Sequence, residues 1–125
     1  MRRESGSAGL PKESVLKIDK DCHVDSQLEQ EYVRNTIVIL SQHHLGVEWV
    51  KATRTQHGRH YYIKIDPAVD ALTANRLQYL LGDDPRRVSY NQARIKSRLL
   101  EWNKLFEAAG RKLRTVYNEN QRHLG

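Results

Sequence analysis

The sequence has one cysteine, Cys22, and no apolar run near the roughly 20 residues that a membrane-spanning helix needs. A single cysteine excludes an intrachain disulfide and gives secretion no support. The first residues, MRRESGSAGLPKES, contain no hydrophobic stretch of the kind found in a signal peptide. These absences favour an intracellular, cytoplasmic protein that does not engage a membrane.

Catalytic signatures are also scarce, and basic charge is what the sequence has in excess. The 125 residues carry 21 Lys and Arg against 15 Asp and Glu, a formal charge of +6. Basic residues gather between Lys51 and Lys64 and again between Arg86 and Arg114. Clustered cations are typical of proteins that bind a polyanion, here nucleic acid, with DNA favoured over RNA. The alternative is that the positive balance serves solubility alone.

The stretch VEWVKATRTQHGRHYYIKID, residues 47–66, has the pattern of a β-hairpin: two runs of β-branched and aromatic residues around His57-Gly58. If these two residues form the loop, Lys51 lies opposite Lys64. Because side chains alternate along a strand, one hairpin face is then mostly apolar. The other face carries Trp49, Lys51, Thr53, His60, Tyr62 and Lys64.

This polar face is the predicted binding surface. Like charges directly opposite one another weaken a strand pair, so a lysine pair beside aromatic rings indicates a site for an anion. Proteins that bind single-stranded nucleic acid stack its bases on aromatic rings that lie beside cations. Trp49 and Tyr62 are the predicted stacking residues. Two alternatives are an ordinary solvated face and a face buried by a helix.

The rest of the chain predicts a single α+β domain over residues 14–110, between a flexible leader (1–13) and a basic, partly frayed tail (111–125). Strand-like alternation covers 14–21, and Ser26 opens a capping box for a helix to about 43. Thr73 is the expected cap of a short helix. Asp84-Pro85 begins a long helix to about 109. The predicted architecture is a two-layer sandwich with helices on one face of a small antiparallel-containing sheet.

Three stretches resemble the archaeo-eukaryotic primase superfamily, in its reduced palm or RRM-like forms from archaea and mobile elements. LKIDKD is similar to a hydrophobic strand ending in Asp-x-Asp, and GRHYYI to a turn leading into a histidine strand. LQYLLGDDPRRVSYNQARI is similar to a segment that follows this strand, so the likeness covers residues 14–95. It implies a palm-like fold in a replication or mobile-element context, with Asp19 and Asp21 as metal ligands and His60 on nucleotide phosphates.

The chain departs from that family at the third metal-binding acid. The family carries it on a later strand, and nothing beyond Pro85 in this sequence has a strand-like pattern. Asp66 is the remaining acid on the proposed face. The departure favours a reduced module that binds nucleic acid without polymerising it.

Three functions are therefore predicted. The first is nucleic-acid binding, by Lys51, Arg54, Arg59, His60, Tyr62, Lys64, Arg86, Arg87 and Arg94. The second is a nucleotidyltransferase, primase-type enzyme or nuclease that uses Mg²⁺ or Mn²⁺ on Asp19, Asp21 and Asp66, with His60 on the phosphates. The third is an interaction module or dimer, in which the apolar stripe of the long helix pairs with another chain.

Overall fold

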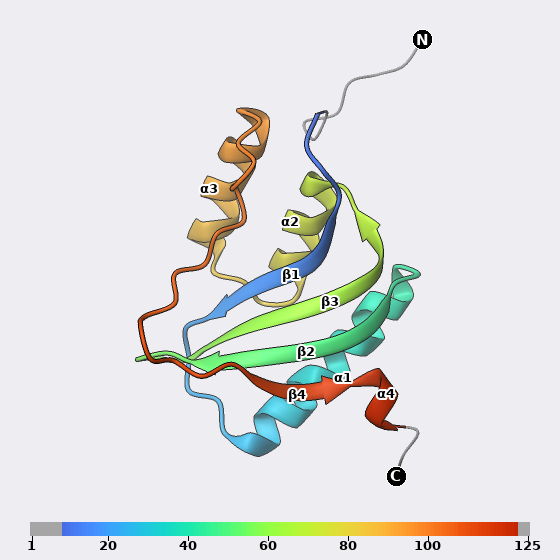
Figure 1. Ribbon diagram of the computed structural model, residues 1–125, viewed down its shortest axis with the longest axis vertical. Helices are drawn as coiled ribbons and strands as arrows, with labels where there is room; N and C mark the ends of the chain where they lie inside the picture. Colours follow the sequence, from blue (N-terminus) through green and yellow to red (C-terminus); the bar gives the residue numbers. More distant parts are fainter. Residues whose placement is uncertain (1–8, 123–125) are drawn as a thin grey trace.

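The computed structural model describes residues 9–122, which fold as an α+β domain around a four-stranded antiparallel sheet. Its elements follow in the order β1 (Glu13–Lys20), α1 (Ser26–Gln42), β2 (Gly46–Arg54), β3 (Arg59–Val69), α2 (Ala71–Leu80), α3 (Pro85–Lys96), β4 (Arg114–Asn118) and α4 (Glu119–Arg122). The strands lie in the order β1-β3-β2-β4 (Figure 1). Strands β1 and β2 therefore both flank β3, and β4 extends the sheet beyond β2.

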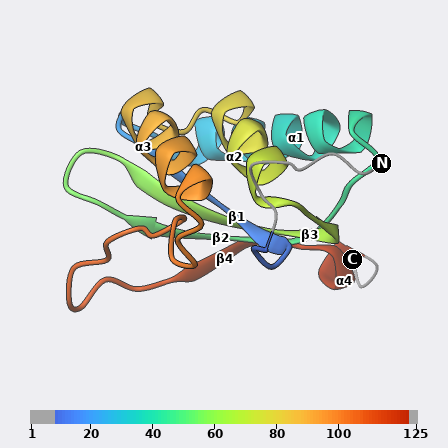
Figure 2. The ribbon, with the colours of Figure 1, turned by 90° about the horizontal axis from the view of Figure 1, so that it is seen from above.

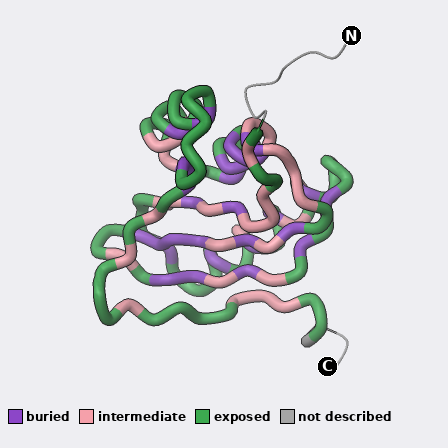
Figure 3. Tube along the Cα trace, turned by 45° about the horizontal axis from the view of Figure 1, so that its top comes forward, coloured by how far each residue is buried: buried purple, intermediate pink, exposed green. Residues whose placement is uncertain are grey.

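The three longer helices, α1, α2 and α3, cover one face of the sheet, as predicted (Figure 2). The residues that point from the strands into this helix layer are fully or almost fully buried, and Figure 3 shows buried positions concentrated in β1, β2 and β3. They are Leu16, Ile18, Val50, Ala52, Tyr61, Ile63 and Ile65. Their neighbours along each strand point to the opposite face, which is the face of functional interest.

The β2-β3 hairpin has a four-residue loop, Thr55–Gly58, instead of the predicted two-residue loop. The Gly58 amide donates to Thr55 Oγ1 at 2.9 Å. A Cβ at Gly58 would lie 1.9 Å from the carbonyl oxygen of Lys20, so only glycine fits where this loop meets the end of β1. The hairpin loop therefore packs directly against the end of β1.

The longer loop shifts the strand register by two residues. Lys51 lies opposite Tyr62 and Trp49 lies opposite Lys64, so the predicted Lys51-Lys64 pair is wrong. The predicted faces are nevertheless confirmed, because side chains alternate with a period of two and a shift of two returns each to the same face. The two lysines share that face without opposing one another.

The helix starts differ from the sequence prediction by one to three residues, except in α3. Asp25, one residue before Ser26, caps α1 by accepting from the Leu28 amide at 2.8 Å. Asp70 caps α2, and its carboxylate accepts from the amide of Thr73, which lies inside the helix. Aspartate and serine or threonine are comparable capping residues, so the pattern admitted either position.

The predicted long helix from Pro85 to about 109 is wrong beyond Lys96. Asp84 caps α3 as predicted, but the helix ends at Lys96 with Ser97 as its C-cap, and Arg98 adopts a positive φ of 59°. The helical spacing of apolar residues continued to residue 106, yet Phe106 is 87% exposed, and of the apolar residues between Lys96 and Phe106 only Trp102 is buried. Helical spacing of apolar residues does not establish that another part of the protein packs against the apolar face of the expected helix.

Residues 114–118, predicted as part of a frayed tail, form the edge strand β4. Its pairing with β2 includes Lys51 with Thr115 and Trp49 with Asn118. The apolar stripe that was expected to pair with another chain is thus divided between α3 and the irregular residues that follow it. Within residues 9–122, none of the helices combines the length and the apolar character needed to cross a membrane.

Candidate functional site on the open sheet face

The sheet face opposite the helices is formed by alternating side chains of β1, β2 and β3. We call it the open face. Its members are Val15, Lys17 and Asp19 from β1, Trp49, Lys51 and Thr53 from β2, and His60, Tyr62 and Lys64 from β3. The predicted strand residues of the polar hairpin face, from Trp49 to Lys64, lie on this surface, but Thr55, which was also expected there opposite His60, lies in the hairpin loop.

Residues 97–113, between α3 and β4, pass over part of the open face; we call them the covering segment (Figure 2). The segment is attached near its start, where Trp102 is 1% exposed and the Asn103 amide donates to Gln78 Oε1 at 2.7 Å. Beyond Asn103 it has no regular structure until residue 114. Glu107 reaches the sheet from this irregular part.

The carboxylate of Glu107 collects donors from two strands. Thr53 Oγ1 lies 2.9 Å from Oε1, and His60 Nδ1 lies 2.6 Å from Oε2. The Tyr62 hydroxyl also donates to Oε2, and Arg111 Nη1 lies 3.4 Å from Oε1. An ionised carboxylate only accepts hydrogen bonds, so all four groups act as donors toward it. The result is a compact oxyanion site that is filled by the protein's own carboxylate.

Protonation states in this cluster follow from the contacts. Burial alone would raise the pKa of Glu107, but hydrogen bonds from Tyr62, His60 and Thr53 outweigh it and hold the pKa below its ordinary value. Burial, reinforced by the bond to Glu107, raises the pKa of the Tyr62 hydroxyl. At neutral pH, Glu107 is therefore a carboxylate and Tyr62 a protonated donor.

A hollow of about 250 Å³ lies beside this cluster, between the sheet and the covering segment. Lys51 Nζ lies 4.5 Å from the centroid of the Trp49 ring, so a cation and an indole are held together at its edge. The lining residues are Val15, Trp49, Lys51, Thr53, Tyr62, Glu107, Arg111 and Leu113. Apolar and aromatic surface thus lies next to two fixed cations, which is the surface chemistry that a base and its phosphate require.

His60 lies between two carboxylates and is only 7% exposed. Its Nε2 is 3.5 Å from Asp19 Oδ1, on the side opposite to Glu107. Direct contact between His60 and a ligand therefore requires that Glu107 move.

Two arginines that the sequence assigned to the binding surface are structural. Arg59 points into the helix layer, where it donates to the Val24 carbonyl at 2.8 Å and faces Glu29 at 3.6 Å. Arg87 has a side chain only 9% exposed and bonds Asp83 at 2.6 Å. Neither guanidinium is presented to a ligand on the open face.

The other predicted arginines also lie off the open face. Arg54 is exposed at the hairpin end and shares its strand face with the buried Ala52. Arg86, with a side chain 84% exposed, lies in the first turn of α3, and Arg94 lies near the end of the helix, 5.9 Å from the Tyr90 ring. Contacts from Arg86 and Arg94 would be made by the helix layer, separately from the hollow.

The three acids predicted to bind a metal are not brought together. Asp19 pairs in register with His60, whereas Asp66 pairs with Gly46, six residues further along β3 and so roughly 20 Å away. Asp21 is exposed beyond the end of β1. Among residues 9–122, no group of three or more His, Cys, Asp or Glu side chains is arranged to hold a metal ion. The predicted Mg²⁺ or Mn²⁺ site therefore does not fit these residues.

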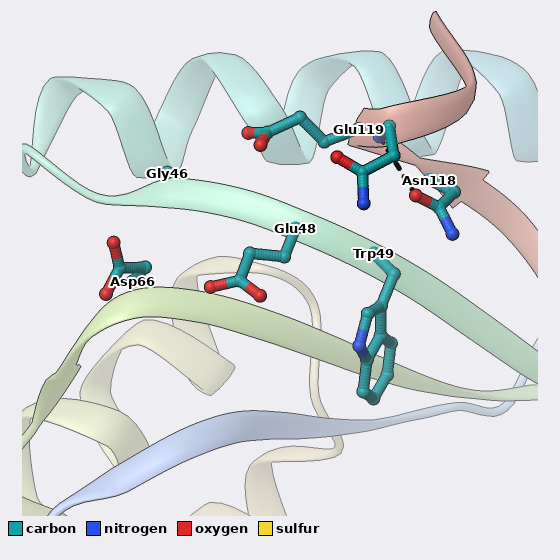
Figure 4. Close-up of a pocket in the computed structure, with 7 residues that line it drawn as sticks. Gly46, Glu48, Trp49, Asp66, Asn118 and Glu119 are labelled. Atoms are coloured by element: carbon teal, nitrogen blue, oxygen red, sulfur yellow. Dashed lines mark hydrogen bonds between the residues drawn. The ribbon is translucent and has the colours of Figure 1, made fainter.

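Asp66 instead lines a second hollow, of about 220 Å³, at the far end of β2 (Figure 4). Glu48 and Glu119 supply two further carboxylates there, and none of the lining residues is basic. Figure 4 also shows the Trp49 side chain extending from β2 toward β3. Trp49 lines both hollows, so the acidic hollow, which repels a polyanion, bounds the candidate site on this side of the indole.

Glu107 and Arg111 are the site residues that the sequence did not predict. Both were expected on or just after a long helix, and a helix ending near residue 109 would have kept them from the sheet. The sequence signal for a break in the helix was weak: Gly110, between Glu107 and Arg111, interrupts the helical pattern. In the structure this glycine has a φ of 87°.

Comparison of the chain with protein-family models, curated proteins and solved structures finds no match.

Proposed function

We propose that this protein is a nucleic-acid-binding domain that holds single-stranded DNA or RNA on the open face of its sheet. The observation that carries the proposal is the hollow in which Trp49 and Tyr62 lie next to Lys51 and Arg111. Single-strand binding proteins combine aromatic rings, on which bases stack, with cations that follow the backbone. The open face supplies both on rigid strands.

Each residue has a distinct role in this proposal. Trp49 stacks on a base, and Lys51, held over the indole at 4.5 Å, meets the adjoining phosphate. Lys64 lies directly opposite Trp49 on β3 and contacts a second phosphate. Arg111 closes the other side of the hollow. Three cations around one indole give a footprint of a few nucleotides.

The topology supports the proposal of a primase-type palm in reduced form. Strands β1 and β2 both flank β3, with α1 crossing between them, which is the core of the split β-α-β arrangement. RNA-recognition domains of that class use a four-stranded sheet whose exposed aromatic residues stack on bases. The fold and the surface chemistry therefore point to the same mode of binding.

We propose binding in preference to nucleotidyl transfer. Two-metal chemistry needs carboxylates close enough to share ions roughly 4 Å apart. Asp19 and Asp66 are separated by six residues of β3. Binding is accordingly expected to be unchanged by EDTA.

Fluorescence anisotropy of labelled single-stranded oligonucleotides tests the proposal. The test variant is Lys51→Gln/Lys64→Gln, which removes two charges from the open face. The matched control is Arg34→Gln/Arg76→Gln, which removes two exposed charges from α1 and α2. A third variant, Arg86→Gln/Arg94→Gln, measures any contribution of α3. Each is titrated at two salt concentrations, with and without EDTA.

The open-face variant is expected to bind more weakly and to lower the slope of log affinity against log salt by roughly 1.4, since each single-strand phosphate contact contributes about 0.7. Trp49→Ala should cost about 1–3 kcal/mol for the lost base stack. An equal loss in the open-face variant and the α1-α2 control would contradict the proposed site. No salt-sensitive binding by the wild type would contradict the proposed function.

A further inference from the structure

The four donors around the Glu107 carboxylate form a site whose chemistry suits any oxyanion. Three of them, Thr53, His60 and Tyr62, are fixed on β2 and β3. The acceptor comes from the irregular part of the covering segment, next to Phe106, which is 87% exposed. Three of the donors thus belong to the rigid sheet, whereas the acceptor and the fourth donor, Arg111, belong to the covering segment.

A phosphate group presents acceptor oxygens to these donors, as a carboxylate does. Both are anions that take short, charge-assisted hydrogen bonds from hydroxyl, imidazole and guanidinium groups. The cluster borders the hollow that holds Trp49 and Lys51, and Thr53, Tyr62, Glu107 and Arg111 line that hollow as well. A strand bound over Trp49 would place a neighbouring phosphate close to Glu107.

A free carboxylate at this position opposes a polyanion. Glu107 brings a negative charge into the middle of the proposed binding surface, and its contacts shield His60, which is only 7% exposed. Its ionised state is maintained by the hydrogen bonds that lower its pKa. The same carboxylate therefore both occupies the donors and repels the ligand.

We propose that Glu107 is an internal competitor: its carboxylate occupies a phosphate site formed by Thr53, His60, Tyr62 and Arg111, and a phosphate of the bound strand displaces it. The covering segment then regulates access to the open face. This inference rests on the proposed function, because the displacing phosphate belongs to the nucleic acid. Displacement moves the Glu107 carboxylate out of the donor cluster, while the Trp102 and Asn103 attachment and the pairing of β4 with β2 hold the two ends of the covering segment.

The test compares Glu107→Gln with Glu101→Gln in the same anisotropy titration. Glu101 lies in the same segment, has a side chain 79% exposed, and forms an ion pair with the exposed Lys104. Both variants remove one negative charge, so the general gain in attraction for a polyanion is matched. Glu107→Gln is expected to bind about tenfold more tightly than Glu101→Gln, because a neutral amide accepts weaker hydrogen bonds from these donors than a carboxylate does.

The outcomes separate the inference from the proposed function. If the wild type binds and the two variants are indistinguishable, Glu107 does not compete and the inference is wrong while the function stands. If Glu107→Gln binds more weakly than Glu101→Gln, the covering segment assists binding, which also overturns the inference. If no form binds the oligonucleotide, the proposed function fails, and the inference fails with it.

Thermal unfolding in inorganic phosphate gives a second readout that needs no oligonucleotide. In Glu107→Ala the donors lose their acceptor, and phosphate is expected to raise the Tm of this variant more than that of the wild type or Glu101→Ala. The Glu107→Gln variant is measured in parallel, since it preserves the side-chain volume. Equal phosphate effects on all four proteins would show that the donors do not form an oxyanion site.

Discussion

Arg87 joins three parts of the fold, and its replacement by methionine is expected to destabilise the domain. Its guanidinium donates to the Lys17 carbonyl on β1 at 3.1 Å and to Asp83 at 2.6 Å. It also donates to Asn103 Oδ1 at 2.8 Å and so attaches the covering segment. Methionine preserves much of the length of the side chain and removes all of these donors.

The expected loss of stability follows from the buried Asp83 carboxylate, which remains after Arg87 is removed. The Asp83 side chain is 0% exposed, and without Arg87 its charge has no cation beside it. Breaking a buried ion pair by removing one partner costs about 3–5 kcal/mol. A domain of this size has a total stability of about 5–15 kcal/mol, so the loss is a large share of it.

The pH dependence supplies a check on the mechanism. Burial raises the pKa of Asp83, and the Arg87 guanidinium, together with hydrogen bonds, opposes that rise. Removing Arg87 raises the pKa further. An acid whose pKa is higher in the folded state binds protons on folding, so stability falls as pH rises through the interval between the unfolded and folded values. Arg87→Met should therefore lose less stability relative to the wild type at acidic pH than at neutral pH.

Urea unfolding of the wild type, Arg87→Met and Arg87→Met/Asp83→Asn at two pH values measures these effects. The double variant should recover part of the loss, because asparagine carries no buried charge while it still accepts from the Asp19 amide, which lies 2.8 Å from Asp83 Oδ1. A loss below about 1 kcal/mol for Arg87→Met, or a double variant less stable than the single one, would refute the structural role.

Three further substitutions test other parts of the account. Gly58→Ala should cost about 1–3 kcal/mol or more in urea unfolding, because the new Cβ would lie 1.9 Å from the Lys20 carbonyl oxygen; an effect below about 1 kcal/mol would contradict the close approach. Trp102→Ala should cost about 3–5 kcal/mol, and a protein unchanged in Tm would contradict its burial at 1% exposure. For Glu29, burial raises the pKa, but the bonds from Arg114 and Tyr61 outweigh it and hold the pKa below 4.5, so the stability it contributes is present above that pH and is lost on acidification. Glu29→Gln should be less stable than the wild type at pH 7 and should lose less stability between pH 5 and 3. If the stability of the variant falls between pH 5 and 3 as much as that of the wild type, Glu29 does not contribute to the acid sensitivity.

The sequence predicted the sheet more accurately than the segments around it. Period-two alternation assigned the faces of β1, β2 and β3, because burying one face constrains every second residue. The loop length was wrong, yet Trp49, Lys51 and Tyr62 were still placed on the open face because the error was an even number of residues. Face assignments are therefore better determined by sequence than strand partners are.

The end of α3 could not be read from apolar spacing. Ile95 and Trp102 are both buried, but the chain reaches Trp102 through turns, and Phe106 points to solvent. Tertiary contacts hold the chain after α3 in a non-helical path: Arg87 and Gln78 form hydrogen bonds with Asn103, and residues 114–118 pair with β2. Contacts of this range are not encoded in a local pattern, which is why Glu107 was missed.

The charged residues illustrate a second limit. Arg59 and Arg87 looked the same as Lys51 and Lys64 in a count of basic charge. The structure separates them by burial: both arginines face internal carboxylates, whereas the lysines lie on the open face. Composition predicts the sign of a partner's charge and leaves the contact residues undetermined.

Amide chemical-shift mapping with a single-stranded oligonucleotide tests the central claim most directly. We expect that titration of the oligonucleotide into ¹⁵N-labelled protein shifts the signals of Trp49, Lys51, Tyr62 and Lys64 together with those of residues 104–113, and leaves the exposed faces of α1 and α2 unchanged. Shifts confined to the helix layer, or no shifts at low salt, would contradict the assignment of the open face as a nucleic-acid-binding surface.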